Sequence, residues 1–314
     1  MEAEKQSKQG GSSLSRDAWI RMGKNKLAMA SLWSFAIMIV LCFGLAWFCK
    51  DPNEINLTNK FAKVSAEHWM GTDALGRDLF SRILYGGQIS ILVGLVATMF
   101  SVCIGITYGS ISGFAGGRTD ATMMRVVDIM LSIPFLVLVI VLQAALAEWS
   151  SNTSHWLVEA WKWDKTLAGR VTNIIPLFFA LGIFGWLTLA RIVRSQVLSI
   201  KEREFIEAAR ALGYPESRIL FRHIIPNTLG PTVVYATLTV PSFIMYEATL
   251  SYLGLGVEAP NSSWGILIKE GANFMETRPE LLILPGIFFS VTLFALNFIG
   301  DGLRDALDVK ASKD

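Results

Sequence analysis

Long apolar segments separated by polar segments dominate the chain. Six charge-free stretches are each about 20 residues or longer, the length that an α-helix needs to cross roughly 30 Å of hydrocarbon. These stretches are 27–48, 83–117, 129–147, 171–190, 224–246 and 281–300. None of them alternates apolar and polar residues over about 10 residues, as the strands of a membrane β-barrel do. The pattern therefore predicts an all-α membrane protein with six transmembrane helices.

The second stretch is longer than one span and opens with Gly86-Gly87-Gln88, so we place its transmembrane helix at 89–112. The other five spans are expected at the bounds of their stretches. We expect the first span, 27–48, to be retained rather than cleaved. Its apolar core of about 22 residues exceeds the 7–15 residues usual for a signal peptide. No Ala-x-Ala cleavage site follows Phe48.

Composition agrees with a membrane protein and excludes several other classes. Hydrophobic residues make up 52% of the chain and charged residues only 17%, with a mean hydropathy of +0.45. An average soluble domain is roughly 25% charged. The net charge of +2 is too small for a nucleic-acid-binding surface. Three cysteines without CxxC spacing predict neither a disulfide framework nor a zinc site.

The positions of Lys and Arg predict the orientation of the spans. Of the 28 basic residues, 18 fall in the segments on one side of the membrane, which we therefore assign to the cytoplasm. These segments are 1–26, 113–128, 191–223 and 301–314. The opposite side would carry 49–88, 148–170 and 247–280. With six spans, both the N-terminus and the C-terminus are expected in the cytoplasm.

Two segments outside the spans are predicted to lie at the membrane surface. Residues 1–26 form a cytoplasmic tail, and within it 14–22 place Trp19 and Met22 on one face of a short interfacial helix. A disordered basic tail is the alternative for this region. The external loop 148–170 carries the tryptophan cluster Trp156, Trp161 and Trp163, a residue type enriched near lipid headgroups. Residues 306–314 are expected to be a second cytoplasmic tail.

The motifs of a membrane enzyme or pump are missing from the sequence. Gly23-Lys24 lacks both the earlier glycine and the following Ser or Thr of a P-loop. The three histidines are far apart, without HExxH or other paired-ligand spacing, and no Gly-x-Ser-x-Gly motif occurs. We therefore predict no catalytic residue, no metal site and no cofactor on this chain, and we expect any energy source to reside on another chain.

The cytoplasmic segment 202–226 has the pattern of two short helices joined by a turn. Strong helix formers run from Glu202 to Leu212, Gly213 is suited to the left-handed position that ends a helix, and Pro215 is suited to begin the next one. An apolar face is expected from the spacing i, i+3, i+4, i+7 of Phe205, Ala208, Ala209 and Leu212, with Glu207 and Arg210 beside it. From the residues alone, this face packs either on the membrane domain of the protein itself or on a partner.

This segment resembles the EAA loop of binding-protein-dependent ABC importer permeases. The similarity is carried by Glu207-Ala208-Ala209, by Gly213 four residues after Ala209, and by His223 with Pro226-Asn227. Further motifs resemble the peptide-permease branch, and in particular the C subunit of oligopeptide permeases. They are Gly71-Thr72-Asp73 with Gly76-Arg77-Asp78, then 251–256, 263–265 and 297–308. Together the motifs cover roughly residues 16–308.

The resemblance implies the fold and activity of a type I ABC importer permease, with its core at 86–305. Such a chain is a non-catalytic subunit of the bacterial inner membrane that translocates oligopeptides. The implied partners are a second homologous permease subunit, two ATPase subunits that bind ATP and Mg²⁺, an extracytoplasmic peptide-binding protein and membrane lipids. The implied contact with the ATPases is the loop 191–223 and the start of the fifth span. Its residues are Phe205, Glu207, Ala208, Ala209, Arg210, Leu212, Gly213, His223, Pro226 and Asn227.

Two further sets of residues have alternative interpretations. Glu247 is the single acidic residue at a span, where an unpaired charge is costly. It would meet the amine of a peptide in the translocation path, pair with a basic residue of a partner permease, or lie among headgroups. Asp73, Arg77 and Asp78 would either form two turns, with the aspartates capping backbone N–H groups, or dock the binding protein.

Other transporter classes remain as alternatives. Dipeptide, antimicrobial-peptide and nickel-complex permeases share much of the same framework. An ion-coupled secondary transporter is the alternative of a different class. It would have several buried ionisable groups and often an inverted repeat. The sequence has one acidic residue at a span and no visible repeat, which disfavours that class.

Overall fold

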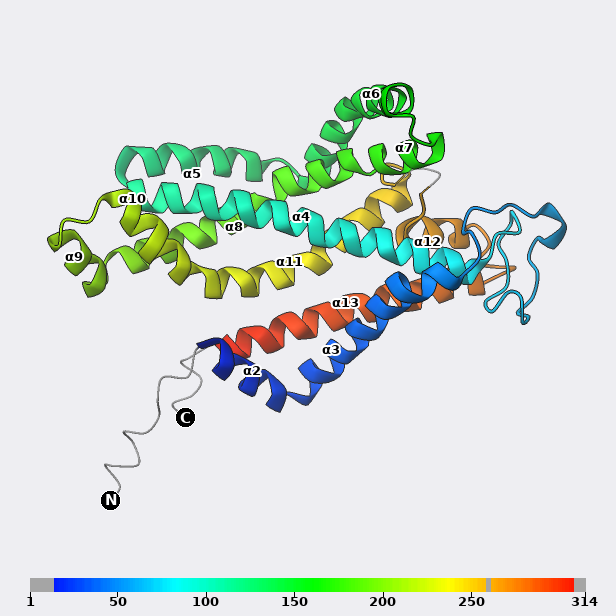
Figure 1. The fold of residues 1–314 in the computed structure, drawn as a ribbon, viewed down its shortest axis with the longest axis horizontal. Coiled ribbons are helices and arrows are strands. Elements are labelled where there is room, and N and C mark those ends of the chain that lie inside the picture. Colours follow the sequence, from blue (N-terminus) through cyan, green and yellow to red (C-terminus); the bar gives the residue numbers. More distant parts are fainter. Residues whose placement is uncertain (1–13, 258–260, 308–314) are drawn as a thin grey trace, which may run out of the picture.

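The computed structural model describes residues 14–257 and 261–307, which form helices and connecting loops with no β-strand (Figure 1). Six helical segments are long and apolar enough to cross a membrane, as predicted. Their helices are α3 (Lys26–Ile39) with its extension to Phe48, α4 (Leu79–Ala115), α6 (Phe135–Trp161), α8 (Ile175–Lys201), α11 (Ile225–Leu253) and α13 (Glu280–Leu307). The shorter helices are α2 (Leu14–Lys24), α5 (Gly117–Ser132), α7 (Lys165–Thr172), α9 (Glu204–Ala211), α10 (Glu216–Ile219) and α12 (Trp264–Ala272).

Helices α4, α8 and α11 pack together in one part of the bundle, and α3 packs on α13 beside them (Figure 1). The α4–α8 contact is close because Gly105, Gly109 and Gly113 recur every fourth residue on the face of α4 toward α8. A Cβ at Gly109 would lie 2.4 Å from the carbonyl oxygen of Ala190, so no larger residue fits there. Small residues at this spacing let two membrane helices approach closely.

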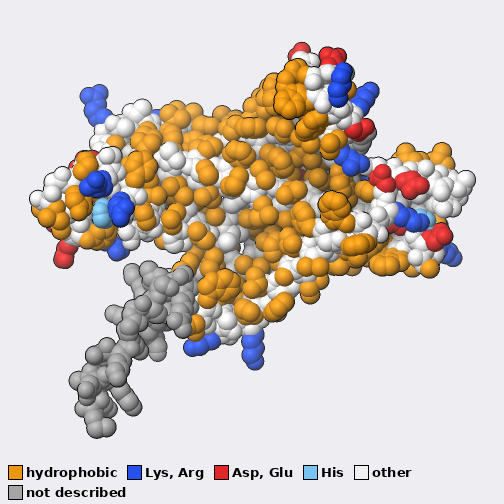
Figure 2. Space-filling model, in the orientation of Figure 1, with side chains coloured by type: hydrophobic (Ala, Val, Ile, Leu, Met, Phe, Trp, Pro, Cys, Tyr) orange, Lys and Arg blue, Asp and Glu red, His pale blue; other side chains and the backbone are white. Residues whose placement is uncertain are grey.

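The two ends of the molecule differ in what they present. One end holds the loop 49–78 and α12, and the other end holds α9, α10 and α2 (Figure 1). Figure 2 shows that, on the face drawn, the charged side chains gather near the ends while hydrophobic side chains cover the length between them. A broad apolar belt between two charged ends is the surface expected of a protein that spans a bilayer.

Several boundaries differ from those expected. Helix α4 begins at Leu79 rather than at residue 89, because Asp78 caps it and the glycines after it are accommodated in the helix. The stretch 129–147 is divided between α5 and α6, since Ile133 has extended backbone before Pro134. The fourth, fifth and sixth helices also extend beyond their apolar stretches at one or both ends. Polar residues end an apolar run without ending a helix.

The prediction of a loop at 148–170 is wrong for most of these residues, which are helical. Helix α6 continues to Trp161 and ends where Lys162 adopts left-handed backbone, and α7 begins at Lys165. Among the tryptophans, Trp156 and Trp161 lie with ring centroids 6.4 Å apart on this helical extension. The segment expected to be a long loop is therefore a helical projection of α6 followed by a short second helix.

The N-terminal helix only partly matches the expectation for an interfacial helix. In α2 the side chain of Met22 is buried against Ala28 and Ala306, whereas Trp19 is exposed. The two residues therefore do not share one environment. The predicted tail segment 1–13 and residues 308–314 lie outside the described residues, while Ala306 and Leu307 belong to α13.

Candidate functional site: the hairpin between α8 and α11

Helices α9 and α10 form a small hairpin at the end of the molecule, between the last turn of α8 and the first turn of α11 (Figure 1). Ile206 and Ala209 of α9 are buried and pack in a cluster that also contains Val197 of α8, Ile219 of α10 and Ile224. This cluster fixes the inner side of the hairpin on the membrane helices. The hairpin is therefore packed as one unit with the ends of α8 and α11.

The outer side of α9 carries apolar groups without a partner in the described chain. Leu212 is 73% exposed and Phe205 is 40% exposed, and Ala208, Glu207 and Arg210 are exposed beside them. Leu and Phe side chains cost free energy in water, so an exposed pair on a charged helix indicates an interaction surface.

The apolar face predicted from the sequence is therefore incorrect in one member. Ala209 faces inward with Ile206, whereas Phe205, Ala208 and Leu212 face outward. The buried stripe, Ile206 and Ala209, was not predicted because its residues and the exposed ones both recur at the spacing of a helix face. The apolar residues Ile219 and Ile224 in the same segment were the available signal for it.

Gly213 ends α9 as predicted, with φ of +74°. Its N–H donates to the carbonyl oxygen of Arg210 over 2.9 Å, and the N–H of Tyr214 donates to that of Ala209 over 3.2 Å. These bonds satisfy carbonyl groups that would otherwise be left open at the end of the helix. The guanidinium of Arg210 also lies 3.4 Å from the carboxylate of Glu216, so both arms of the hairpin are joined across the turn.

The remaining residues of the predicted site join the hairpin to α11. His223 stacks on Tyr214, a residue that lies outside the set predicted from the motif. The side-chain amide of Asn227 donates to the carbonyl oxygen of His223 over 2.6 Å. Pro226 lies in the first turn of α11, where its missing N–H has no cost. The ten predicted residues thus fall on one continuous structural unit.

Two ion pairs hold α8 near the base of the hairpin. Arg194 binds the carboxylate of Asp120 through two nitrogens, and Ser112 donates to the same carboxylate over 2.6 Å. The hydrogen bonds from Arg194 hold the pKa of Asp120 below its ordinary value, although burial opposes the shift. Asp120 lies on α5, and Arg191 pairs with Asp128 of that same helix. Helix α5 is thereby tied to α8.

At the opposite end, Asp73 and Arg77 belong to a buried charge network. Both Arg77 Nε and Arg82 Nη1 lie 2.7 Å from Asp73 Oδ2, and Arg82 Nη1 lies 2.6 Å from Glu270 Oε2. Burial would raise the pKa of Asp73, but the charges of Arg82 and Arg77 and hydrogen bonds from Arg77 lower it below its ordinary value. The network joins the loop 49–78 to α4 and α12.

The aspartates of this loop act as caps, as one of the two interpretations predicts. The N–H of Ser81 donates to Asp78 over 2.8 Å and that of Leu75 donates to Asp73 over 2.8 Å. His68 lies 2.9 Å from the second oxygen of Asp78. Both aspartates are buried, so their carboxylates do not face a partner in this conformation.

Glu247 lies inside the subunit, which none of its three predicted environments describes. Its carboxylate is fully buried and accepts hydrogen bonds from Ser251 over 2.7 Å and from Ser90 over 2.8 Å. Ser90 in turn accepts a hydrogen bond from the N–H of Trp264 over 3.3 Å. The group connects α4, α11 and α12. Within residues 14–257 and 261–307, no three His, Cys, Asp or Glu side chains are grouped as metal ligands.

Comparison with known proteins places this geometry among transporters. Residues 105–313 match the family described as binding-protein-dependent transport system inner membrane component. Residues 13–63 match the N-terminal transmembrane domain of oligopeptide transport permease C. The chain is 46% identical to the oligopeptide transport system permease protein OppC of Haemophilus influenzae, over 96% of this chain and 90% of that protein. It is 42% identical to OppC of Bacillus subtilis, over 99% of this chain and 94% of that one.

A solved structure shares the fold. The inward-facing methionine ABC transporter MetNI contains a chain that aligns with a TM-score of 0.50 at 20% sequence identity. The alignment covers 72% of this chain and 96% of the other. At that identity the match shows a common arrangement of helices. It agrees with the type I importer permease fold that the motifs predicted.

Proposed function

The chain belongs to the family of binding-protein-dependent transport system inner membrane components, and from this premise we propose that it is the C-type permease subunit of an ATP-driven oligopeptide importer. Relatives named as oligopeptide permeases are 42–46% identical over nearly the full chain. A dipeptide permease protein of Bacillus subtilis is 38% identical over 95% of the chain. The closer match favours oligopeptides over dipeptides as the cargo.

The observation that carries the proposal is the hairpin, which is anchored on one side and open on the other. Ile206 fixes its inner side to the ends of α8 and α11, while Phe205 and Leu212 face outward. A rigid element with a free apolar surface is what a transmembrane subunit needs to receive a movement from an ATPase subunit. Glu207, exposed on the same helix, would supply a polar contact at the edge of that surface.

The mechanism follows from the packing of the helices that carry the hairpin. ATP binding draws two ATPase subunits together, and the docked hairpins move with them. Helix α8 packs closely on α4 through Gly105, Gly109 and Gly113, so a displaced hairpin tilts a packed group of helices rather than one helix. The change is a rigid-body switch between two packings. ATP and Mg²⁺ are bound by the partner ATPases, and this chain positions the helices.

The same proposal assigns the two ends of the molecule to two compartments. The hairpin end, with α2 and the end of α13, lies in the cytoplasm, and both termini lie there with it. The end with the loop 49–78 and α12 faces outward and receives peptide from a binding protein. A second homologous permease subunit completes the path in the bacterial inner membrane. The bias of basic residues toward the hairpin side supports this orientation.

A paired substitution on the outer side of α9 tests the proposal in the complete transporter. Phe205→Ala with Leu212→Ala removes two apolar groups from the docking surface and leaves Ile206 in place. We expect co-purified ATPase subunits and peptide uptake to fall by at least about tenfold, since each of the two apolar contacts at an interface is worth on the order of 1–2 kcal/mol.

The matched control is Leu57→Ala, which removes another exposed leucine at the opposite end of the molecule. It should leave ATPase binding unchanged. Retention of the ATPase subunits and of uptake in the paired variant would contradict the assignment of the hairpin as the contact with the ATPase.

A further inference from the structure

A cavity of about 460 Å³ lies between α4, α8, α11 and the start of α6, near the middle of the membrane-spanning helices. Hydroxyl groups from three helices line it, and no charged side chain of the described chain does. They belong to Thr98 and Ser101 of α4, Thr188 of α8 and Tyr235, Thr239, Ser242 and Tyr246 of α11. Its size falls within the roughly 300–1,000 Å³ of small-molecule binding sites.

One of these hydroxyl groups has no hydrogen-bond partner although it is buried. The side chain of Thr98 is 6% exposed, and its Oγ1 has no partner within the described chain. Leaving a buried hydroxyl unpaired costs roughly 1–3 kcal/mol. A cavity that holds such a group is suited to a ligand that supplies the missing hydrogen bond.

The hydroxyl groups of α11 keep acceptor capacity toward the cavity. Thr239 donates to the carbonyl oxygen of Tyr235 over 2.7 Å, and Ser242 donates to that of Leu238 over 3.4 Å. A hydroxyl that donates within its own helix still has lone pairs for an incoming N–H group. The cavity therefore offers hydrogen-bond acceptors and the unpaired hydroxyl of Thr98 in otherwise apolar walls.

These properties select a chemical class of ligand. The main chain of a peptide carries one N–H donor and one C=O acceptor at nearly every residue, whatever the side chains. Hydroxyl groups bind both kinds. A fixed charge in such a low-dielectric site would hold an opposite charge strongly and reject a like charge. An uncharged, hydroxyl-lined cavity thus suits peptides of varied sequence.

A second cavity of about 670 Å³ lies farther along the same helices, toward the end that holds α12. Helices α6, α7 and α8 and the loop after α11, with Gly254 and Gly256, line it, and Lys165 of α7 is among the lining residues. The first cavity reaches Tyr246 of α11 and the second begins at Gly254, directly after the end of α11, so the last turns of α11 separate the two.

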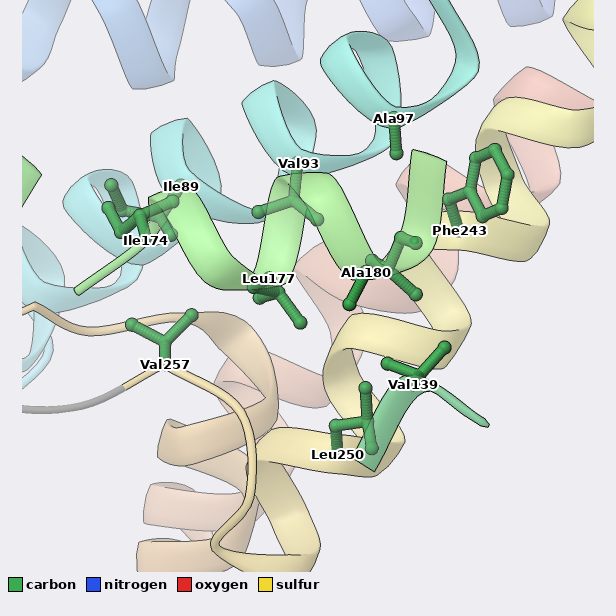
Figure 3. Close-up of a cluster of buried hydrophobic side chains, with 11 residues drawn as sticks. Ile89, Val93, Ala97, Val139, Ile174, Leu177, Ala180, Phe243, Leu250 and Val257 are labelled. Atoms are coloured by element: carbon green, nitrogen blue, oxygen red, sulfur yellow. The ribbon is translucent and has the colours of Figure 1, made fainter. Parts of the chain in front are cut away.

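An apolar, well-packed layer forms the end of the first cavity toward the second, and Phe135, Phe243 and Tyr246 of this layer line the first cavity. The rings of Phe135 and Tyr246 lie 4.7 Å apart and those of Phe243 and Tyr246 lie 6.4 Å apart. Val139 of α6 and Leu250 of α11 lie beside each other in the same layer, close to α8 (Figure 3). Both are fully buried.

We infer that the two cavities are the part of the peptide path that this subunit contributes, and that Phe135, Phe243 and Tyr246 are its seal. In this conformation the seal is closed. The hydroxyl-lined cavity on its hairpin side binds the peptide main chain. The inference rests on the proposed function, because it takes the cargo to be a peptide.

Thiol labelling of the complete transporter in membrane vesicles tests the cavity. Cys42, Cys49 and Cys103 are first replaced by serine, and Thr188→Cys or Ser242→Cys is then introduced. The control is Val233→Cys, an exposed position on α11 that lines neither cavity. The probe is a trimethylammonium methanethiosulfonate, which reacts with thiolates in contact with water.

We expect both cavity cysteines to react about tenfold faster than the control, since a thiol held against hydrocarbon ionises poorly. Modification should abolish peptide uptake and leave ATP hydrolysis intact. Reaction as slow as that of Val233→Cys, or full uptake after modification, would overturn the inference. If the cavity cysteines react as expected while the unmodified transporter takes up no peptide, the proposed cargo fails and the cavity stands.

The seal has its own test in the Ser242→Cys background. Phe135→Ala with Tyr246→Ala should let the probe reach the introduced thiol from the α12 side several times faster. Phe179→Ala is the matched control, because that ring packs on Phe100 in a tilted arrangement and lines neither cavity. Equal rates in the paired variant and in the control would overturn the assignment of the seal.

Discussion

The phenol ring of Tyr214 stacks on the imidazole of His223, with ring centroids 6.0 Å apart and planes 18° from parallel. Tyr214 belongs to the turn that ends α9, and His223 lies in the helical turn that leads into α11. The guanidinium of Arg218 lies 5.4 Å from the centroid of the same phenol ring. These contacts join the tip of the hairpin to a membrane-spanning helix, so they stiffen the element that we propose transmits movement.

Tyr214→Ala should loosen this joint without removing the docking surface. An aromatic pair contributes about 0.5–1.5 kcal/mol, which is small against the stability of a whole domain. We therefore expect normal assembly but a severalfold rise in ATP hydrolysed per peptide imported, measured in proteoliposomes of the complete transporter. Tyr214→Phe should behave like the wild type. Tyr252→Ala, which removes an exposed tyrosine at the other end of α11, is the control. Unchanged coupling in Tyr214→Ala would contradict a mechanical role for the stack.

Asp73 predicts a specific dependence of stability on pH. Arg82 and Arg77 lower its pKa in the folded protein despite burial, so folding favours the ionised carboxylate. The stability that this adds is complete above the ordinary pKa of about 3.9 and is lost as the pH falls through the lower folded value. Thermal unfolding in detergent should therefore show a loss of stability in that acid range.

Asp73→Asn should remove that part of the acid dependence and lower stability at neutral pH. The loss is about 3 kcal/mol, because one partner of a buried ion pair is removed and Glu270 is the acidic partner that Arg82 keeps. Glu54→Gln, an exposed acid in the same loop, is the matched control and should change neither property. A wild-type acid profile in Asp73→Asn would show that the network does not hold the loop to α4 and α12.

The parts of the fold that the sequence predicted are those with a local signal. The lengths of the apolar stretches were enough to locate the six spans. Gly213 is correctly predicted to end α9 because only that residue has to tolerate positive φ. Asp78 accepts a hydrogen bond from a nearby backbone N–H, as one interpretation predicted, because Ser81 is only three residues away. Each of these features depends on a few neighbouring residues, which the sequence displays directly.

The parts that the sequence did not predict depend on distant contacts. Ile206 faces inward rather than Phe205 because Ile219 and Ile224 form the surface that α9 packs on. Arg82 meets Glu270 from 188 residues away, and no spacing rule connects them. Glu247 is held by Ser90, a contact that follows from how α4 crosses α11. In all three cases, tertiary packing sets which residues the side chain contacts.

Replacing Glu247 tests whether it is structural. Glu247→Leu would leave Ser90 and Ser251 without their acceptor in a fully buried site. We expect a loss of about 2–4 kcal/mol in the free energy of unfolding, seen as a lower unfolding temperature in detergent. Glu247→Gln should lose less, since one acceptor oxygen remains. Glu148→Leu removes an exposed acid from α6 and is the control. A stable Glu247→Leu with impaired uptake would instead indicate a direct role in transport.

Substitutions at Gly213 test whether the backbone geometry of the turn between α9 and α10 is needed for transport. Its φ of +74° excludes proline, which fixes φ near −65° and also lacks the N–H that donates to Arg210. No atom lies within 4 Å of the place where a Cβ would stand, so other residues face only backbone strain. Asparagine tolerates this backbone better than most residues do. We therefore expect Gly213→Asn to import peptide at close to the wild-type rate. Gly213→Pro should assemble and still hydrolyse ATP, but its peptide uptake should be at least about tenfold lower. A tenfold loss is equivalent to roughly 1.4 kcal/mol of coupling. Both quantities are measured on the same proteoliposomes. Equal uptake by the two variants would mean that the angle between α9 and α10 does not matter, and that the hairpin is no lever.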